Sequence, residues 1–135
     1  MAPFHPSSAV LRLADVAGSK SALEAALGVK LDRYEPARKG SLNYAQMDLN
    51  DGWDAIVDRI QTVGPQISAL RRDGVIGAAA IDLPVLFDES LAALSVQVPS
   101  HVAEAVGRYA IDIEISIYLT NERGSVRQRA KPTAR

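Results

Sequence analysis

The sequence predicts an α+β fold, in which helices cover one face of a mostly antiparallel sheet. Three observations predict it. Residues 110–119, AIDIEISIYL, carry a large aliphatic side chain at every second position, which is the period of a strand with one buried face. Further short apolar segments are bounded by Gly, Pro, Asn and Asp. Segments with helical spacing fall between them. The expected order is βαββαββαβ, and two fused ferredoxin-like halves would produce it.

Length and charge indicate one domain with a short extension. The 135 residues fit a single α+β domain over residues 1–121, followed by a basic tail, residues 122–135, that has the character of a disordered end. The tail carries a formal charge of +4 and the body a formal charge of −5. An acidic body argues against nucleic acid as the main ligand, so we expect no nucleic-acid partner.

Composition also bears on location. The chain has no cysteine, which excludes disulfides and thiolate chemistry and is compatible with a reducing cytoplasm. No apolar run approaches the roughly 20 residues that a membrane span needs. The first residues lack the pattern of a signal peptide. We therefore expect a cytoplasmic protein without a membrane partner.

The first strand and helix are expected near the start of the chain. Residues 8–13 alternate in the manner of a strand. Ser19 is a suitable N-cap for the helix that follows, because its hydroxyl can accept a hydrogen bond from a free amide. Leu23 and Leu27 give this helix an apolar stripe, and Gly28 stands where a C-terminal cap needs positive φ.

A hairpin and the longest helix come next. Residues 29–35 and 42–49 predict two strands joined by a loop that contains Pro and Gly. Asp51 is a candidate N-cap for a helix that starts at Trp53. Gly64-Pro65 is expected to interrupt this helix and to start a second short one, because proline lacks the amide hydrogen.

The second half of the chain predicts two more strands and a helix before the isoleucine-rich strand. Residues 75–83 form an apolar run of small side chains that reads as a strand, and Pro84 should end its pairing. Residues 86–90 are expected to be a loop and residues 91–98 a strand. A short helix should follow over residues 100–107.

Several short motifs occur in an order that resembles a known family. They are Leu27-Gly28-Val29, Lys39-Gly40, Trp53 at the head of a helix, and residues 112–118 in the last strand. In these motifs the chain is similar to the bacterial domain-of-unknown-function family 4279, and the likeness spans residues 8–118. The resemblance implies a small bacterial cytoplasmic protein without a catalytic assignment. It also implies a possible role as an immunity protein that neutralises a toxin.

The candidate site lies on the last strand. Asp112 and Glu114 are two residues apart, so both point to the same face of the sheet, and Tyr118 continues that face. Arg12 joins them if the first and last strands share a sheet. This surface suggests a non-enzymatic module that binds a protein partner, which could be basic. Two alternatives stay open. The acidic pair could serve a small hydrolase or isomerase, or the protein could be a structural homodimer that pairs its sheets.

Other chemistry finds little support in the sequence. The chain has two histidines: His5 lies in a proline-flanked N-terminal segment, and His101 lies at the start of a predicted helix, where the helix dipole disfavours its charged form. Two histidines so placed make a histidine-based metal site improbable. No phosphate-binding loop, dinucleotide motif or nucleophile elbow occurs. We therefore assign no catalytic residue and expect neither a metal nor a cofactor.

Overall fold

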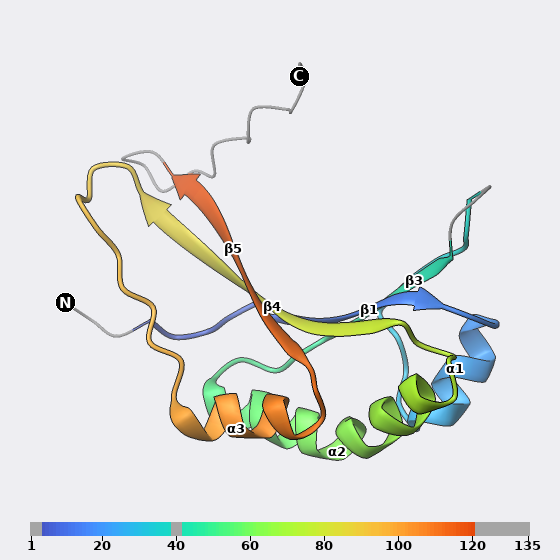
Figure 1. Ribbon diagram of the computed structural model, residues 1–135. Coiled ribbons are helices and arrows are strands. Elements are labelled where there is room, and N and C mark those ends of the chain that lie inside the picture. Colours follow the sequence, from blue (N-terminus) through green and yellow to red (C-terminus); the bar gives the residue numbers. More distant parts are fainter. Residues whose placement is uncertain (1–3, 39–41, 121–135) are drawn as a thin grey trace.

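The computed structural model describes residues 4–38 and 42–120 (Figure 1). The predicted tail, residues 122–135, lies outside these ranges. Eight elements follow one another in the described part: β1 (Val10–Val16), α1 (Lys20–Leu27), β2 (Arg33–Glu35), β3 (Asn43–Asp48), α2 (Trp53–Arg72), β4 (Ala78–Asp88), α3 (Ser100–Arg108) and β5 (Asp112–Thr120). The α+β class is thus confirmed. The order is βαββαβαβ, with one strand fewer than predicted.

The strands form one mixed, mostly antiparallel sheet in the order β2-β3-β1-β4-β5. Neighbouring strands are antiparallel except for β4 and β5, which run parallel. The first six elements have the βαββαβ order of one ferredoxin-like half. After them, the described chain adds only α3 and β5, which is too little for the predicted second half.

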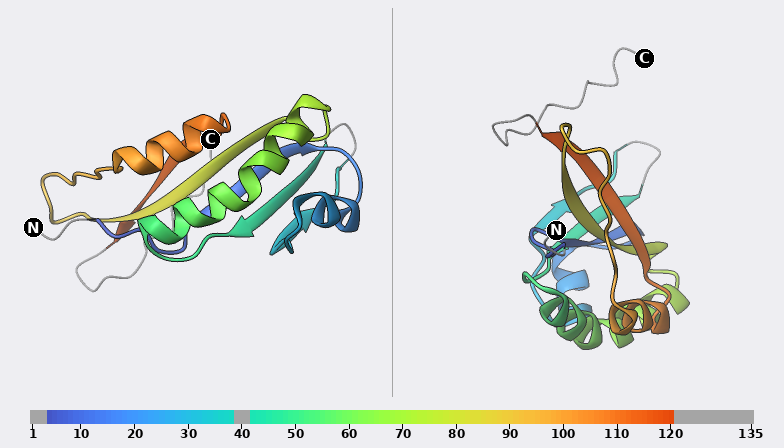
Figure 2. Two further views of the ribbon diagram at one scale, coloured as in Figure 1. Left: turned by 90° about the horizontal axis from the view of Figure 1, so that it is seen from below. Right: turned by 90° about the vertical axis from the view of Figure 1, so that its left-hand side faces the viewer.

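The three helices of the described part all lie against one face of the sheet, as Figure 1 and both views of Figure 2 show. We call the opposite face, which no described helix covers, the open face. The far ends of β4 and β5 project beyond the helical layer (Figure 1). The core lies between sheet and helices, and its largest fully buried side chains are Leu11, Leu13, Met47, Ile56, Ile60, Ile67, Ile76, Ile81 and Leu83.

The first helix and the hairpin agree with the prediction. Ser19 caps α1 and accepts a hydrogen bond from the amide of Ala22 at 3.1 Å. Gly28 ends the helix with φ of 76°, a left-handed conformation that favours glycine. Strands β2 and β3 pair antiparallel, as expected.

The predicted break at Gly64-Pro65 is wrong, because α2 runs through both residues as one helix of 20 residues. Pro65 and Gln61, the residue four positions before it, are both exposed. Water can therefore bind the Gln61 carbonyl that lacks an amide partner, and this limits the cost of the proline. Asp51 does not cap the helix either, because Gly52 holds the N-cap position.

Two predictions about β4 and the segment after it are also wrong. Pro84 does not end the strand, which continues to Asp88 and takes in most of the predicted loop 86–90. The pairing of β4 with β1 stops at Asp82, so Pro84 sits where β4 has β5 on one side only, and a strand edge tolerates proline. Residues 91–98 form no strand.

Candidate functional site

The residues of the predicted site come together on the open face. The sheet register places Ala80 between Arg12 and Asp112, and in the next row it places Asp82 between Val10 and Glu114. Strands β1 and β5 thus share the sheet but are separated by β4. The small Ala80 side chain leaves room for a long side chain from β1 to cross β4.

Arg12 bridges two carboxylates. Its Nη2 lies 2.8 Å from Oδ2 of Asp82, and its Nη1 lies 3.2 Å from Oε1 of Glu114. Ser116 donates its hydroxyl to Oδ1 of Asp82 at 2.6 Å. We call Arg12, Asp82, Glu114 and Ser116 the Arg12 network. It joins three strands by charged and polar contacts.

Asp82 is the buried centre of this network. The residue is 4% exposed, although no described helix covers its face of the sheet. A buried carboxylate is costly unless it is paired and hydrogen-bonded, and here Arg12 and Ser116 supply both kinds of contact. The network therefore fixes Arg12 in place, and Arg12 in turn holds Glu114.

Asp112 and Tyr118 stand apart from the network. Asp112 is exposed, and Tyr118 is partly buried in register with Leu86 of β4. Neither side chain forms a hydrogen bond or an ion pair within the residues that the structure describes. Of the four predicted site residues, the structure thus brings Arg12 and Glu114 into contact and leaves the other two beside them.

Sequence reasoning missed Asp82 and Ser116. A signal for Asp82 was present, because it is a lone acid in the apolar run of residues 75–83. An acid inside a strand with two neighbours needs a cation near it, and Arg12 stands at an alternating position of the first strand. The pairing of the two requires the sheet order, which the sequence pattern does not contain.

The open face continues over β2 and β3. Tyr44 donates its hydroxyl to Oε1 of Gln46 at 2.9 Å, and Arg33 forms an ion pair with Glu35. Burial raises the pKa of the Tyr44 phenol above 10.0, while Arg12 and Arg33 oppose that rise. The phenol therefore stays neutral and acts as a hydrogen-bond donor near pH 7.

The described part of the open face is acidic. The register puts two arginines and six carboxylates on it, a formal charge of −4: Arg12, Arg33, Glu35, Asp48, Asp82, Asp88, Asp112 and Glu114. Most of these groups are partly or fully exposed. A surface of this kind attracts cations and basic macromolecules.

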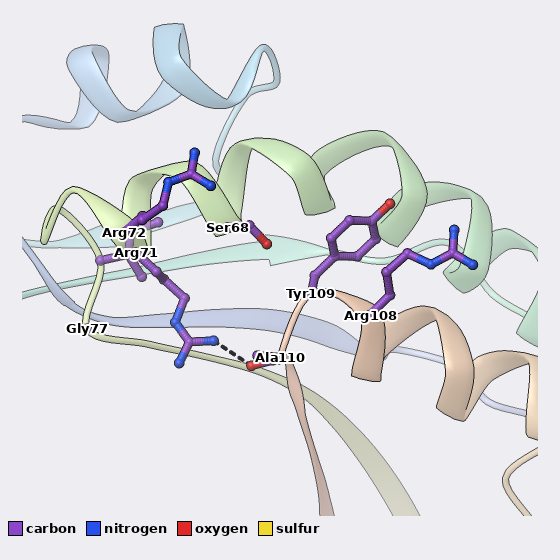
Figure 3. Close-up of a pocket in the computed structure, with 8 residues that line it drawn as sticks. Ser68, Arg71, Arg72, Gly77, Arg108, Tyr109 and Ala110 are labelled. Carbon is purple, nitrogen blue, oxygen red and sulfur yellow. Dashed lines mark hydrogen bonds between the residues drawn. The ribbon is translucent and has the colours of Figure 1, made fainter.

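A hollow of about 420 Å³ opens on the helical side of the molecule, where α2 and α3 end (Figure 3). It is lined by Ser68, Arg71, Arg72, Ile76, Gly77, Arg108, Tyr109 and Ala110. Figure 3 shows the three guanidinium groups pointing in different directions. Arg71 donates to the Ala110 carbonyl, and Arg108 pairs with Glu104 at 3.3 Å. The arginines therefore do not converge on one anion.

A second hollow, of about 280 Å³, is apolar. It lies at the projecting ends of β4 and β5 and is lined by Val85, Phe87, Leu94, Val96 and Ile117. Leu94 and Val96 belong to the segment that was predicted to be a strand. Their alternation therefore serves side-chain packing without strand pairing.

His101 contacts one acidic residue at the surface. Nε2 of His101 lies 3.2 Å from Oδ1 of Asp54 at the surface. Within residues 4–38 and 42–120, no three His, Asp or Glu side chains gather closely enough to hold a metal ion.

Among the helices that the structure describes, none has the length and apolar character required to cross a membrane.

Comparisons of this chain with protein-family models, with curated proteins and with solved structures found no match. The family resemblance drawn from the sequence motifs thus stays a prediction.

Proposed function

We propose that this protein is a non-enzymatic binding module that docks a basic protein partner on the open face of its sheet. The observation that carries the proposal is the charge of this face, on which six carboxylates stand against two arginines and no described helix covers them. Long-range attraction then brings a basic partner to the sheet.

The Arg12 network supports a binding role more than a catalytic one. Arg12 holds Glu114 in an ion pair, whereas Asp112 faces solvent. None of the residues that line the two hollows described above is Asp112, Glu114 or Tyr118. A general acid and base need a shared pocket in which a substrate can be held. An acidic surface on which Arg12 holds Glu114 in an ion pair suits a protein partner better.

The resemblance to a family with immunity-like members narrows the partner to a toxin domain. A toxin domain must be basic to match the acidic open face, so purified basic bacterial toxin domains are the probes of choice. The open-face variant replaces both exposed carboxylates of β5, as Asp112→Asn with Glu114→Gln. The control variant, Asp58→Asn with Asp73→Asn, makes the same change in charge at exposed positions of α2 and its C-cap.

Association and dissociation rates are measured for the wild type and both variants at low and at physiological salt. The open-face variant should associate several-fold more slowly at low salt, and the loss should shrink at physiological salt because charges are screened over about 8 Å. The control variant should match the wild type. Equal rates for all three proteins, or no binding of any basic toxin domain, would overturn the proposal.

A further inference from the structure

The outer edge of β5 is unpaired in the described part of the chain. Among residues 4–38 and 42–120, β5 pairs with β4 alone, and it is the last strand in the sheet order. Along its outer edge, β5 therefore presents a row of main-chain N–H and C=O groups that no described strand pairs, which is a template for another strand. Four aliphatic side chains on the helical side of β5 are also exposed: Ile113 by 36%, Ile115 by 43%, Ile117 by 55% and Leu119 by 43%.

The two edge strands of the sheet differ in length and in the polarity of their side chains. The other edge strand, β2, has three residues, and its Arg33 and Glu35 are exposed and charged. Short strands and charged side chains are the usual protection against edge pairing. β5 is three times as long and carries apolar side chains that are partly exposed to water. The short length and the charged side chains that block pairing at β2 are thus absent on the helical side of β5.

We propose that two copies of this protein pair antiparallel through β5, about a two-fold axis at Ser116, and so join their sheets into one. The centre at Ser116 lets all nine residues of each β5 take part. It places Ile115 opposite Ile117 of the second copy and Ile113 opposite Leu119. Both aliphatic rows then lie on the same side of the joined sheet and cover each other.

The positions of the charged residues in β5 favour antiparallel pairing about Ser116 over other registers. Asp112 and Glu114 are both in the first half of the strand, and the second half holds Ser, Tyr and Thr at the equivalent positions. Antiparallel pairing about Ser116 puts Glu114 opposite Tyr118 and Asp112 opposite Thr120. Parallel pairing in register, or a centre at Glu114, would set carboxylate against carboxylate, which is unfavourable in directly opposed pairs.

The size of the contact suits a dimer of modest affinity. Nine paired residues span about 30 Å, and with side chains on both faces this edge would bury on the order of 500 Å² per copy. The total, about 1,000 Å², is at the lower end for a specific interface. The dimer should therefore dissociate on dilution. The proposed dimer does not depend on the proposed function, because a two-fold axis normal to the sheet leaves the open faces of both copies uncovered.

The first test is the oligomeric state, measured by sedimentation over a range of protein concentrations. The wild type should shift from monomer to dimer as concentration rises. Ile115→Lys with Ile117→Lys should stay monomeric at every concentration. Leu42→Lys, at another exposed leucine far from β5, is the matched control and should dimerise like the wild type.

The second test determines the register by cysteine cross-linking. The chain has no cysteine, so an introduced cysteine is the only thiol in each copy. In the proposed dimer the two Ser116 side chains are opposite each other, with Cβ atoms about 5 Å apart. Ser116→Cys should therefore form a disulfide-linked dimer under oxidation. Glu114→Cys alone should not, because its two copies lie about 13 Å apart along the strands. Glu114→Cys mixed with Tyr118→Cys should cross-link.

Three outcomes would overturn the proposal. One is a wild type that is monomeric at all concentrations. Another is efficient cross-linking of Glu114→Cys alone with none at Ser116→Cys, which would assign a different register. The third is a dimer that appears only after the chain is truncated at Thr120, because the edge would then belong to the chain's own last residues.

Discussion

Arg12 and Glu114 are 102 residues apart in the chain and belong to strands that are not neighbours, yet their side chains meet at 3.2 Å across β4. The contact depends on Asp82 of the intervening strand, which lies 2.8 Å from the same guanidinium. Because Asp82 is buried and Glu114 is half-exposed, the two ion pairs should differ in their effect on stability.

This difference gives the first prediction. Arg12→Met should lower the free energy of unfolding by about 1–3 kcal/mol, because it leaves the buried Asp82 carboxylate without its cation. Glu114→Gln should cost less than about 1 kcal/mol, as expected for an exposed partner. Urea unfolding of both variants measures the two costs. Equal costs would mean that Asp82 does not rely on Arg12.

Local patterns in the sequence predicted the elements that depend on neighbouring residues. The serine cap of α1, its Gly28 terminator and the alternation along β5 all rest on contacts within a few positions, and the structure contains each of them. The predicted burial of the aliphatic face of residues 110–119 is wrong for Ile113 and Ile115, which stand near the middle of that face, because both are partly exposed. Alternation identifies the face of a strand but does not say whether another layer reaches it.

The remaining errors concern residues whose surroundings are set by the tertiary structure. Pro65 was expected to break a helix and Pro84 to end a strand, but each falls where the missing amide hydrogen costs little. Asp82 went unnoticed because its partners come from β1 and β5. The outcomes at Pro84 and Asp82 follow from the sheet order, and the outcome at Pro65 follows from the exposure of that side of α2; local patterns supply neither.

A second prediction concerns the contact between Gly64 of α2 and Tyr109. A Cβ at Gly64 would lie 2.3 Å from Cδ2 of the Tyr109 ring, far closer than atoms can pack. Gly64→Ala should therefore destabilise the protein by about 1–3 kcal/mol, although alanine is the better helix former. Thermal or urea unfolding measures the loss.

Gly107 of α3 offers the matched control for Gly64. A Cβ at Gly107 would meet nothing within 4 Å, so Gly107→Ala should leave stability unchanged or raise it by up to about 1 kcal/mol. Combining Gly64→Ala with Tyr109→Ala should recover part of the cost of the glycine change. A cost for Gly64→Ala that is the same with and without the ring would contradict the clash.

The third prediction concerns pH. Burial raises the pKa of Tyr44 above 10.0, so the folded protein holds this proton more firmly than the unfolded chain does. The resulting stability is fully present below the unfolded pKa and is lost as pH rises through the folded pKa. The wild type should thus lose more stability than Tyr44→Phe between about pH 9 and pH 11. Urea unfolding at both pH values checks this, and parallel losses in the two proteins would contradict it.

The last prediction separates burial within one copy from burial between two. Ile111 is 4% exposed and Ile113 is 36% exposed, although both point to the helical side of the sheet. Ile111→Ala should cost about 2–5 kcal/mol at any protein concentration, as a truncation in the core does. For Ile113→Ala in dilute protein, a smaller loss of about 1–2 kcal/mol is expected, because part of the side chain is already in water.

Protein concentration should change the second of these costs. If β5 pairs with a second copy, Ile113→Ala should become more destabilising as concentration rises, because the dimer stabilises only the folded wild type. Asp112→Ala, on the opposite side of the same strand, should cost under about 1 kcal/mol throughout. Unfolding measured at two protein concentrations tests all three variants. A concentration-independent cost for Ile113→Ala would place its whole contribution within a single copy.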